Sequence, residues 1–248
     1  KRIAYKFIVK KALQKAVAVI VPTKAVGQDI QEFVRIPNNK IELIHEGTSE
    51  FGREVNPELG LADQSYFFYV GNAYPHKNLE NLLEGFLEFS SKNPDIKLVF
   101  AGKKDFFYER LLQLPITKAL GNSFVYIESP TDGELKYLYK HSLSFVSSSL
   151  MEGFALPALE ALSNGTVVIL SDIPVFKEVC KDVPVAYFDP NKPSEVSTAM
   201  RKVIDETPQK RNEKIALGQK LAKSFSWRDM AERTLAVYES SSGLRSSE

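Results

Sequence analysis

The pattern of hydrophobic and polar residues predicts that strands and helices alternate along most of the chain. Short runs of β-branched and aromatic residues, each followed by turn residues, predict strands. Longer segments with apolar residues at i, i+3, i+4 and i+7 predict helices. The predicted strands are 17–21, 41–44, 66–70, 96–101, 124–127, 143–147, 167–170 and 185–188. The predicted helices are 1–15, 23–35, 79–87, 106–113, 132–140, 155–164, 174–180, 194–206, 209–225 and 227–239.

This alternation predicts the fold class and the domain boundaries. The strands are continuously apolar, which is typical of strands that are covered on both faces in a parallel sheet. We therefore expect an α/β fold with a doubly wound, Rossmann-like parallel sheet over residues 65–225. Residues 47–64 keep no sustained period and predict a linker. Residues 1–46 predict the last elements of a preceding unit of the same class, and residues 226–248 predict a final helix and tail.

Composition excludes several classes of protein. Lys and Arg number 32 against 31 Asp and Glu, a formal net charge of +1, and nucleic-acid binding usually needs a basic excess. The single Cys180 excludes an intramolecular disulfide and a cysteine-rich zinc site, and it suits a reducing compartment. His45, His76 and His141 lack metal-ligand spacing, so we expect no metal. No run of about 18 apolar residues occurs, so we expect a cytoplasmic protein. The first residue is Lys1, so we also expect a piece of something longer.

The turn 71–78 after a predicted strand is one candidate site. In open parallel sheets, ligands bind outside the carboxyl ends of the strands. Gly71 permits a tight turn, and Lys77 lies near the start of the following helix, where free backbone N–H groups favour an anion. A cation at a helix N-terminus opposes the macrodipole, so Lys77 needs a negative partner. From these residues alone, the turn is either a phosphate site or a turn with a solvated lysine, and both interpretations stay open.

The turn after strand 143–147 is the second candidate. Glu152 would lie in the crevice, where a carboxylate can accept hydrogen bonds from sugar hydroxyls. The N–H groups of Phe154, Ala155 and Leu156 open the next helix and can face an anion.

Three further polar positions have ordinary structural explanations. Glu160 shares a helix sector with Ser163 and Asn164, so a solvent-facing stripe explains it as well as a binding role. Asp105 and Asp172 each precede a predicted helix and are interpreted as N-caps.

Several segments together resemble glycosyltransferase family 4. The segment Glu152-Gly-Phe-Ala-Leu-Pro-Ala-Leu-Glu160 resembles the family signature, whose two glutamates fall on Glu152 and Glu160. The turn Gly71-Asn-Ala-Tyr-Pro-His-Lys-Asn78 is similar to the family's phosphate-contacting turn. Residues 40–47 look like the segment that leads into the second domain, and Phe225-Ser-Trp227 resembles a motif before the last helix, which returns to the first domain.

The resemblance implies a GT-B enzyme, with this chain as the C-terminal donor-binding half and residues 1–46 as a remnant of the N-terminal acceptor domain. Such enzymes transfer a sugar from a nucleotide-sugar donor with retention, without a required metal or cofactor. The implied donor is UDP- or GDP-linked, and the implied acceptor is a glycan or a lipid-linked molecule in polysaccharide biosynthesis. The sequence Pro75-His-Lys-Asn78 in the turn favours GDP-mannose as the donor.

The resemblance also implies roles for individual residues. Lys77 would bind the donor diphosphate, Glu160 the ribose hydroxyls and Glu152 the transferred sugar, so that Lys77 and Glu152 are the implied catalytic pair. The implied donor-binding set is Gly71, Asn72, Lys77, Glu152, Gly153, Phe154, Ala155, Leu156 and Glu160.

The chain departs from the family pattern at three positions. Asn72 stands where the family often has arginine, Ala155 stands where it has glycine, and Glu128 stands where a glycine is usual. His76 or Lys103 are candidate substitutes for the missing cation.

Two alternatives stay open. The chain is alternatively a non-catalytic nucleotide-sugar-binding module that needs a separate acceptor-domain partner. The basic helix 1–15 either packs on another domain or contacts a membrane surface, which would put the protein at the inner membrane.

Overall fold

The computed structural model describes residues 2–48, 51–56, 61 and 64–242. The chain divides into two compact units, one made of the residues up to 47 with those from 225 onward, the other of residues 48–224. Each unit is described by itself.

The larger unit contains a six-stranded sheet in which all strands are parallel, in the order β5-β4-β3-β6-β7-β8. The strands are β3 Tyr66–Val70, β4 Lys97–Gly102, β5 Phe124–Glu128, β6 Ser144–Ser147, β7 Val168–Ser171 and β8 Ala186–Phe188. Most of their side chains are buried, as expected for strands covered on both faces. The predicted doubly wound parallel sheet is therefore confirmed.

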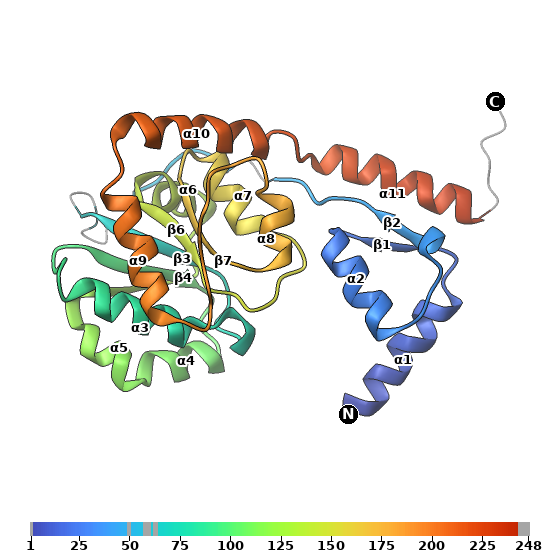
Figure 1. Ribbon diagram of the computed structural model, residues 1–248, viewed down its shortest axis with the longest axis horizontal. Helices are drawn as coiled ribbons and strands as arrows, with labels where there is room; N and C mark the ends of the chain where they lie inside the picture. The colour runs from blue at the N-terminus through green and yellow to red at the C-terminus, as the bar shows by residue number, and fades with distance from the viewer. Residues whose placement is uncertain (1, 49–50, 57–60, 62–63, 243–248) are drawn as a thin grey trace. The chain divides into compact units, whose positions relative to one another are not determined.

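Helices cover both faces of this sheet (Figure 1). One layer holds α3 Leu79–Ser90, α4 Phe106–Gln113, α5 Pro115–Leu120 and α9 Pro193–Ile204. The other layer holds α6 Asp132–His141, α7 Leu156–Ser163 and α10 Pro208–Ala222. The short η2 Pro75–Lys77, η3 Gly121–Ser123 and α8 Pro174–Val179 complete the unit. The core cluster lies between the sheet and the layer of α3 and α9 and includes Phe67, Phe86, Phe100 and Met200.

Two local predictions about helix ends had different outcomes. Asp105 caps α4 as predicted, since its Oδ1 accepts hydrogen bonds from the N–H groups of Phe107 and Tyr108. The predicted N-cap role of Asp172 is wrong. Ile173 occupies the cap position of α8 without a side-chain bond, and the Asp172 carboxylate instead pairs with Lys177 at 2.5 Å.

The pattern also missed α5 and misjudged some element ends. The six residues of α5 begin at Pro115, directly after α4, so they form too short a segment for a period to show. Strand β1 spans Val19–Val21, two residues shorter at its start than predicted.

The described part of the predicted linker has no helix or strand, yet it contacts α6. The Phe51 ring lies 5.7 Å from that of Tyr139, and Glu54 pairs with Lys140 and His141.

The smaller unit holds a two-stranded parallel sheet, three α-helices and one short 3₁₀ helix among its described residues. Its elements are α1 Arg2–Lys15, β1, α2 Lys24–Phe33, η1 Asn38–Lys40, β2 Ile41–Leu43 and α11 Trp227–Ser242. Thr23 caps α2, and Arg233 of α11 donates a hydrogen bond to the Leu43 carbonyl at 2.7 Å. The predicted basic helix at the start of the chain is present, with Tyr5, Phe7 and Ile8 all more than half exposed. Within the described residues, no helix is long and apolar enough to cross a membrane.

Candidate functional site

The strand order reverses between β3 and β6, which are neighbours in the middle of the sheet. The connections that leave β3 and β6 run to opposite layers, so a crevice forms at their carboxyl ends. The predicted phosphate turn follows β3, and the loop with Glu152 follows β6. The fold therefore brings the two candidate turns to the same edge of the sheet.

Lys77 and Glu152 form an ion pair across this edge. The Lys77 Nζ lies 2.6 Å from Glu152 Oε1, and the two side chains are only 15% and 19% exposed. Ser149 Oγ donates a second hydrogen bond to the same carboxylate oxygen, also at 2.6 Å. The negative partner that Lys77 needs near a helix N-terminus is thus a residue of the chain itself.

Further hydrogen bonds join the turn after β3 to the loop after β6. The Leu150 N–H donates to the His76 carbonyl at 2.8 Å. Ser148 Oγ donates to the carbonyls of Lys77 and Asn78, at 2.8 and 3.0 Å. These hydrogen bonds hold the two segments together. The segments that carry Lys77 and Glu152 therefore cannot move apart without breaking them.

A small hollow opens beside the ion pair. Lys77 and Glu152 line it together with Tyr69, Ala155 and Phe176. The hollow is lined by one cation, one carboxylate and several apolar side chains. Such a lining suits a ligand in which a charged group adjoins a less polar group.

The turn after β3 approaches the neighbouring strand β4 closely. Gly71 has a φ of +149°, which favours glycine, and a Cβ there would lie 2.9 Å from the Tyr69 hydroxyl. A Cβ on Gly102 would lie 2.2 Å from the Gly71 carbonyl oxygen. The Asn72 side chain is exposed and accepts a hydrogen bond from the Tyr74 N–H at 3.2 Å. Asn72 therefore shapes the turn, and its amide brings no charge to it.

Glu160 lies on α7 in a half-buried position. The fully buried Tyr139 hydroxyl donates a hydrogen bond to Glu160 Oε2 at 2.9 Å. Burial raises the pKa of Glu160, and the Tyr139 hydrogen bond opposes that rise. The interpretation of Glu160 as part of a plain solvent-facing stripe does not hold, because its carboxylate accepts a hydrogen bond from a buried hydroxyl.

The segment 153–156 leads into α7 as predicted. Gly153 is exposed, whereas the side chains of Phe154 and Ala155 are buried, so only their backbone can meet a ligand. Ala155 has a φ of −147°, in the range open to residues with a Cβ, which explains why alanine is accepted there. Helix α7 begins at Leu156, and the N–H groups of its first turn have no partners within the helix.

The other positions named by the sequence lie apart from this arrangement. The His76 ring is exposed and lies 6.0 Å from the Tyr74 ring, and Lys103 is exposed after β4. Glu128 is exposed at the end of β5. In the described part of the chain, no group of three or more His, Cys, Asp or Glu residues is placed to hold a metal ion.

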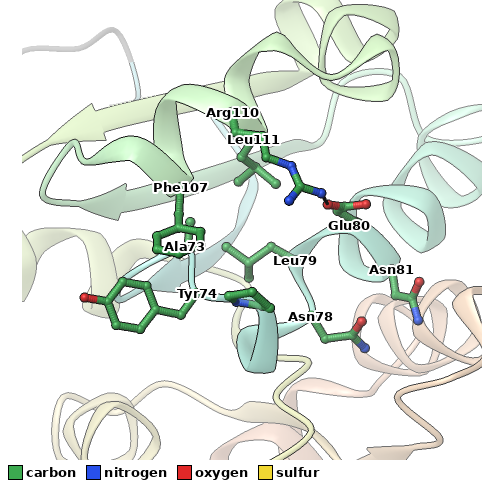
Figure 2. Close-up of a pocket in the computed structure, with 10 residues that line it drawn as sticks. Ala73, Tyr74, Asn78, Leu79, Glu80, Asn81, Phe107, Arg110 and Leu111 are labelled. Atoms are coloured by element: carbon green, nitrogen blue, oxygen red, sulfur yellow. Dashed lines mark hydrogen bonds and ion pairs between the residues drawn. The ribbon is translucent and has the colours of Figure 1, made fainter. Parts of the chain in front are cut away.

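The same turn also borders a second cavity, of about 180 Å³, between η2, α3 and α4. Figure 2 shows the Arg110 guanidinium directed toward the Glu80 carboxylate, with Leu79 and Phe107 nearby. This ion pair, at 2.8 Å, is more than half exposed on both sides and contributes little to stability.

Sequence reasoning missed four side chains that make hydrogen bonds to predicted site residues: Ser149, Tyr69, Tyr108 and Tyr139. The tyrosines lie within apolar runs or helix faces, where the pattern does not distinguish them from core residues. Their hydroxyl partners include backbone carbonyls, which a side-chain pattern does not reveal.

Comparison with known proteins agrees with this fold. The chain matches a solved structure of Anabaena HepE in complex with UDP-glucose with a TM-score of 0.81 and 16% identity, over 96% of this chain and 68% of that one. The larger unit has the fold of the C-terminal half of GT-B glycosyltransferases. A family model described as "Glycosyl transferases group 1" matches residues 53–220. The chain belongs to this glycosyltransferase family, which confirms the resemblance.

Two curated relatives are mannosyltransferases. The chain is 26% identical over 204 residues to the O-antigen chain mannosyltransferase RfbU of Salmonella typhimurium, covering 82% of this chain and 55% of the relative. It is 31% identical over 183 residues to the O-antigen chain mannosyltransferase B of Escherichia coli, covering 72% and 47%. The chain thus spans about half the length of the curated relatives it matches.

Proposed function

We propose that this chain carries the donor site of a retaining, metal-independent hexosyltransferase that takes mannose from a nucleotide-linked donor and adds it to a glycan or lipid-linked acceptor. The observation that carries the proposal is the Lys77–Glu152 ion pair at the strand-order reversal, with Glu160 on the helix that follows. The relatives named as O-antigen mannosyltransferases support mannose as the sugar.

Each of the three charged side chains has a proposed task. The Lys77 ammonium stabilises negative charge on the departing diphosphate, which is the main electrostatic demand of the reaction. Glu152 accepts hydrogen bonds from hydroxyls of the transferred sugar. Glu160 accepts hydrogen bonds from the ribose hydroxyls and so fixes the nucleoside. Donor binding therefore requires Lys77 to share its charge between Glu152 and phosphate, at the point where the ion pair now stands.

The proposed transfer is balanced without a base from this chain. The bond between the sugar C1 and the phosphate oxygen breaks, and a bond from C1 to the acceptor oxygen forms on the same face. The leaving diphosphate takes the acceptor's hydroxyl proton. The chain's own residues bind the donor, stabilise the charge on the leaving group and orient the sugar.

The test is a calorimetric titration of the chain with GDP, UDP and ADP, repeated on Glu160→Ala. We expect one of the three nucleotides to bind saturably, and we expect that nucleotide to be GDP. We expect Glu160→Ala to weaken that binding about tenfold, because hydrogen bonds to a charged group contribute roughly 1.5–3 kcal/mol. Glu109→Ala, which changes an exposed carboxylate on a different helix, α4, is the matched control and should bind as the unaltered chain does. Absence of binding by all three nucleotides would overturn the proposal. Donor binding without transfer to any acceptor would instead favour the non-catalytic binding module.

A further inference from the structure

Two buried tyrosines donate hydrogen bonds to consecutive carbonyls of the turn after β3. The Tyr108 hydroxyl lies 2.9 Å from the Gly71 carbonyl oxygen, closer than its distance of 3.2 Å to the Ala101 carbonyl oxygen. The Tyr69 hydroxyl lies 2.7 Å from the Asn72 carbonyl oxygen. Both side chains are at most 2% exposed, so these bonds are made on the protein side of the turn.

The two bonds set the direction of the peptide groups. A planar trans peptide directs its C=O and its N–H to opposite sides, and the described residues contain no cis peptide bond. Because the Gly71 and Asn72 carbonyls are directed to buried hydroxyls, the N–H groups of Asn72 and Ala73 are directed away from them. Within the described part of the chain, neither N–H donates a hydrogen bond.

The turn has little freedom to take another orientation. The Gly71 N–H donates to the Ala101 carbonyl at 3.0 Å, and the missing Cβ of Gly102 lets the Gly71 carbonyl lie against β4. Burial raises the pKa of both Tyr69 and Tyr108, so their hydroxyls stay protonated and remain donors.

The donor site has a corresponding need for hydrogen-bond donors. Lys77 supplies a positive charge at the donor site, but in the free chain that charge is already paired with the Glu152 carboxylate. A diphosphate presents several anionic oxygens, and consecutive backbone N–H groups in a turn are well suited to bind them.

We propose that the N–H groups of Asn72 and Ala73 bind the diphosphate of the donor, and that Tyr69 and Tyr108 are positioning residues that hold these groups toward it. The inference rests on the proposed function and deepens it. Tyr69 and Tyr108 act through the backbone carbonyls to which their hydroxyls donate.

The test compares nucleoside diphosphate with nucleoside monophosphate. Tyr69→Phe and Tyr108→Phe each remove one hydroxyl and keep the ring. Tyr66→Phe is the matched control, because its buried hydroxyl also donates to a carbonyl, that of Leu138 at 3.0 Å, away from the turn. The dissociation constants for GDP and GMP, or for UDP and UMP if the uridine nucleotide binds, are measured by calorimetry for all three variants.

We expect the preference for diphosphate over monophosphate to fall about fivefold in each of the two positioning variants, the effect of weakening one charged hydrogen bond. We expect Tyr66→Phe to keep the preference for diphosphate, even if it lowers the melting temperature as much as Tyr69→Phe and Tyr108→Phe do. A preference that stays unchanged in Tyr69→Phe and Tyr108→Phe, including the case where both nucleotides weaken equally, would overturn the inference.

The same data separate this inference from the proposed function. If the unaltered chain binds no nucleoside diphosphate, the proposed function fails and this inference fails with it. If the unaltered chain binds and Glu160→Ala weakens that binding while the tyrosine variants leave the preference unchanged, the inference alone fails.

Discussion

Two glutamates of one segment meet different surroundings. Glu152 is paired with Lys77 and accepts a hydrogen bond from Ser149, so its negative charge is compensated. Glu160 has the neutral Tyr139 hydroxyl as its hydrogen-bond donor, and burial raises its pKa. The free chain therefore pairs one carboxylate with a cation, whereas the other has a neutral partner and is ionised against the cost of its burial.

This difference predicts a pH-dependent gain in stability for Glu160→Gln. A raised pKa in the folded chain means that the protonated carboxyl is favoured there. The stability that Glu160 contributes is present below its unfolded pKa and is lost as pH rises through the raised folded pKa. Glu160→Gln keeps an acceptor for Tyr139 and cannot ionise, so urea unfolding should show it to be more stable than the unaltered chain at neutral pH. The advantage should shrink as the pH falls below the folded pKa. An advantage that does not depend on pH would contradict the assignment.

The same residue predicts a pH-dependent affinity. Ribose hydroxyls donate to an ionised carboxylate more strongly than to a protonated one. Nucleotide affinity should therefore decline as the pH is lowered through the raised pKa of Glu160. In Glu160→Gln the affinity should be lower, by about tenfold, and the decline should be shallower, because only protonation of the nucleotide's phosphate, with a pKa of about 6, then remains. Calorimetric titration across the acidic range checks both outcomes.

Some of these residues could be predicted from the sequence and others could not. Lys77, Glu152 and Glu160 are charged residues next to apolar strands or helix starts, so a pattern of polar and apolar positions reveals them. Tyr69 and Tyr108 count as apolar in the same pattern, and their hydroxyl partners are carbonyls whose position depends on the turn geometry. The Lys77–Glu152 pairing joins residues 75 positions apart and needs the strand order to be known.

At the scale of elements, close helix packing depends on glycines at two contacts. A Cβ on Gly85 of α3 would lie 2.5 Å from the Pro193 carbonyl oxygen and 2.5 Å from the Val196 Cβ of α9. A Cβ on Gly218 of α10 would lie 2.6 Å from Leu162 Cδ2 of α7. These helices pack on opposite layers, so each face of the sheet has one such contact.

We expect Gly85→Ala to destabilise the chain by about 1–3 kcal/mol through overpacking. Alanine is the better helix former by about 1 kcal/mol, so the net loss is smaller than the strain itself. Chemical denaturation measures the change. Gly52→Ala is the control, because a Cβ at that loop position meets nothing within 4 Å. Equal stability of Gly85→Ala and the unaltered chain would contradict the close contact of α3 and α9.

The element pattern was predictable where strands were apolar and helices were long. It failed at α5, which is short and directly follows α4, and at the start of α8, where Asp172 pairs with Lys177 instead of capping the helix. The first failure comes from the shortness of α5, and the second from an ion pair that local periodicity does not encode.

At the scale of the whole molecule, every residue assigned to donor binding lies in the larger unit, residues 48–224. The assignment of residues 1–46 to an acceptor domain stays a prediction, as do the linker and the acceptor itself. The near-zero net charge agrees with a small anionic ligand held by a few placed groups.

The most direct test of the account is the affinity of the chain for its nucleoside diphosphate in Lys77→Met. Methionine keeps most of the side-chain length and removes the charge. Lys202→Met, at an exposed position on α9, is the control. The account predicts that Lys77→Met weakens diphosphate binding about tenfold or more, since it removes a charged hydrogen bond to phosphate, and that Lys202→Met leaves it unchanged. Equal affinity of Lys77→Met and the unaltered chain would contradict the central claim that this lysine binds the donor diphosphate.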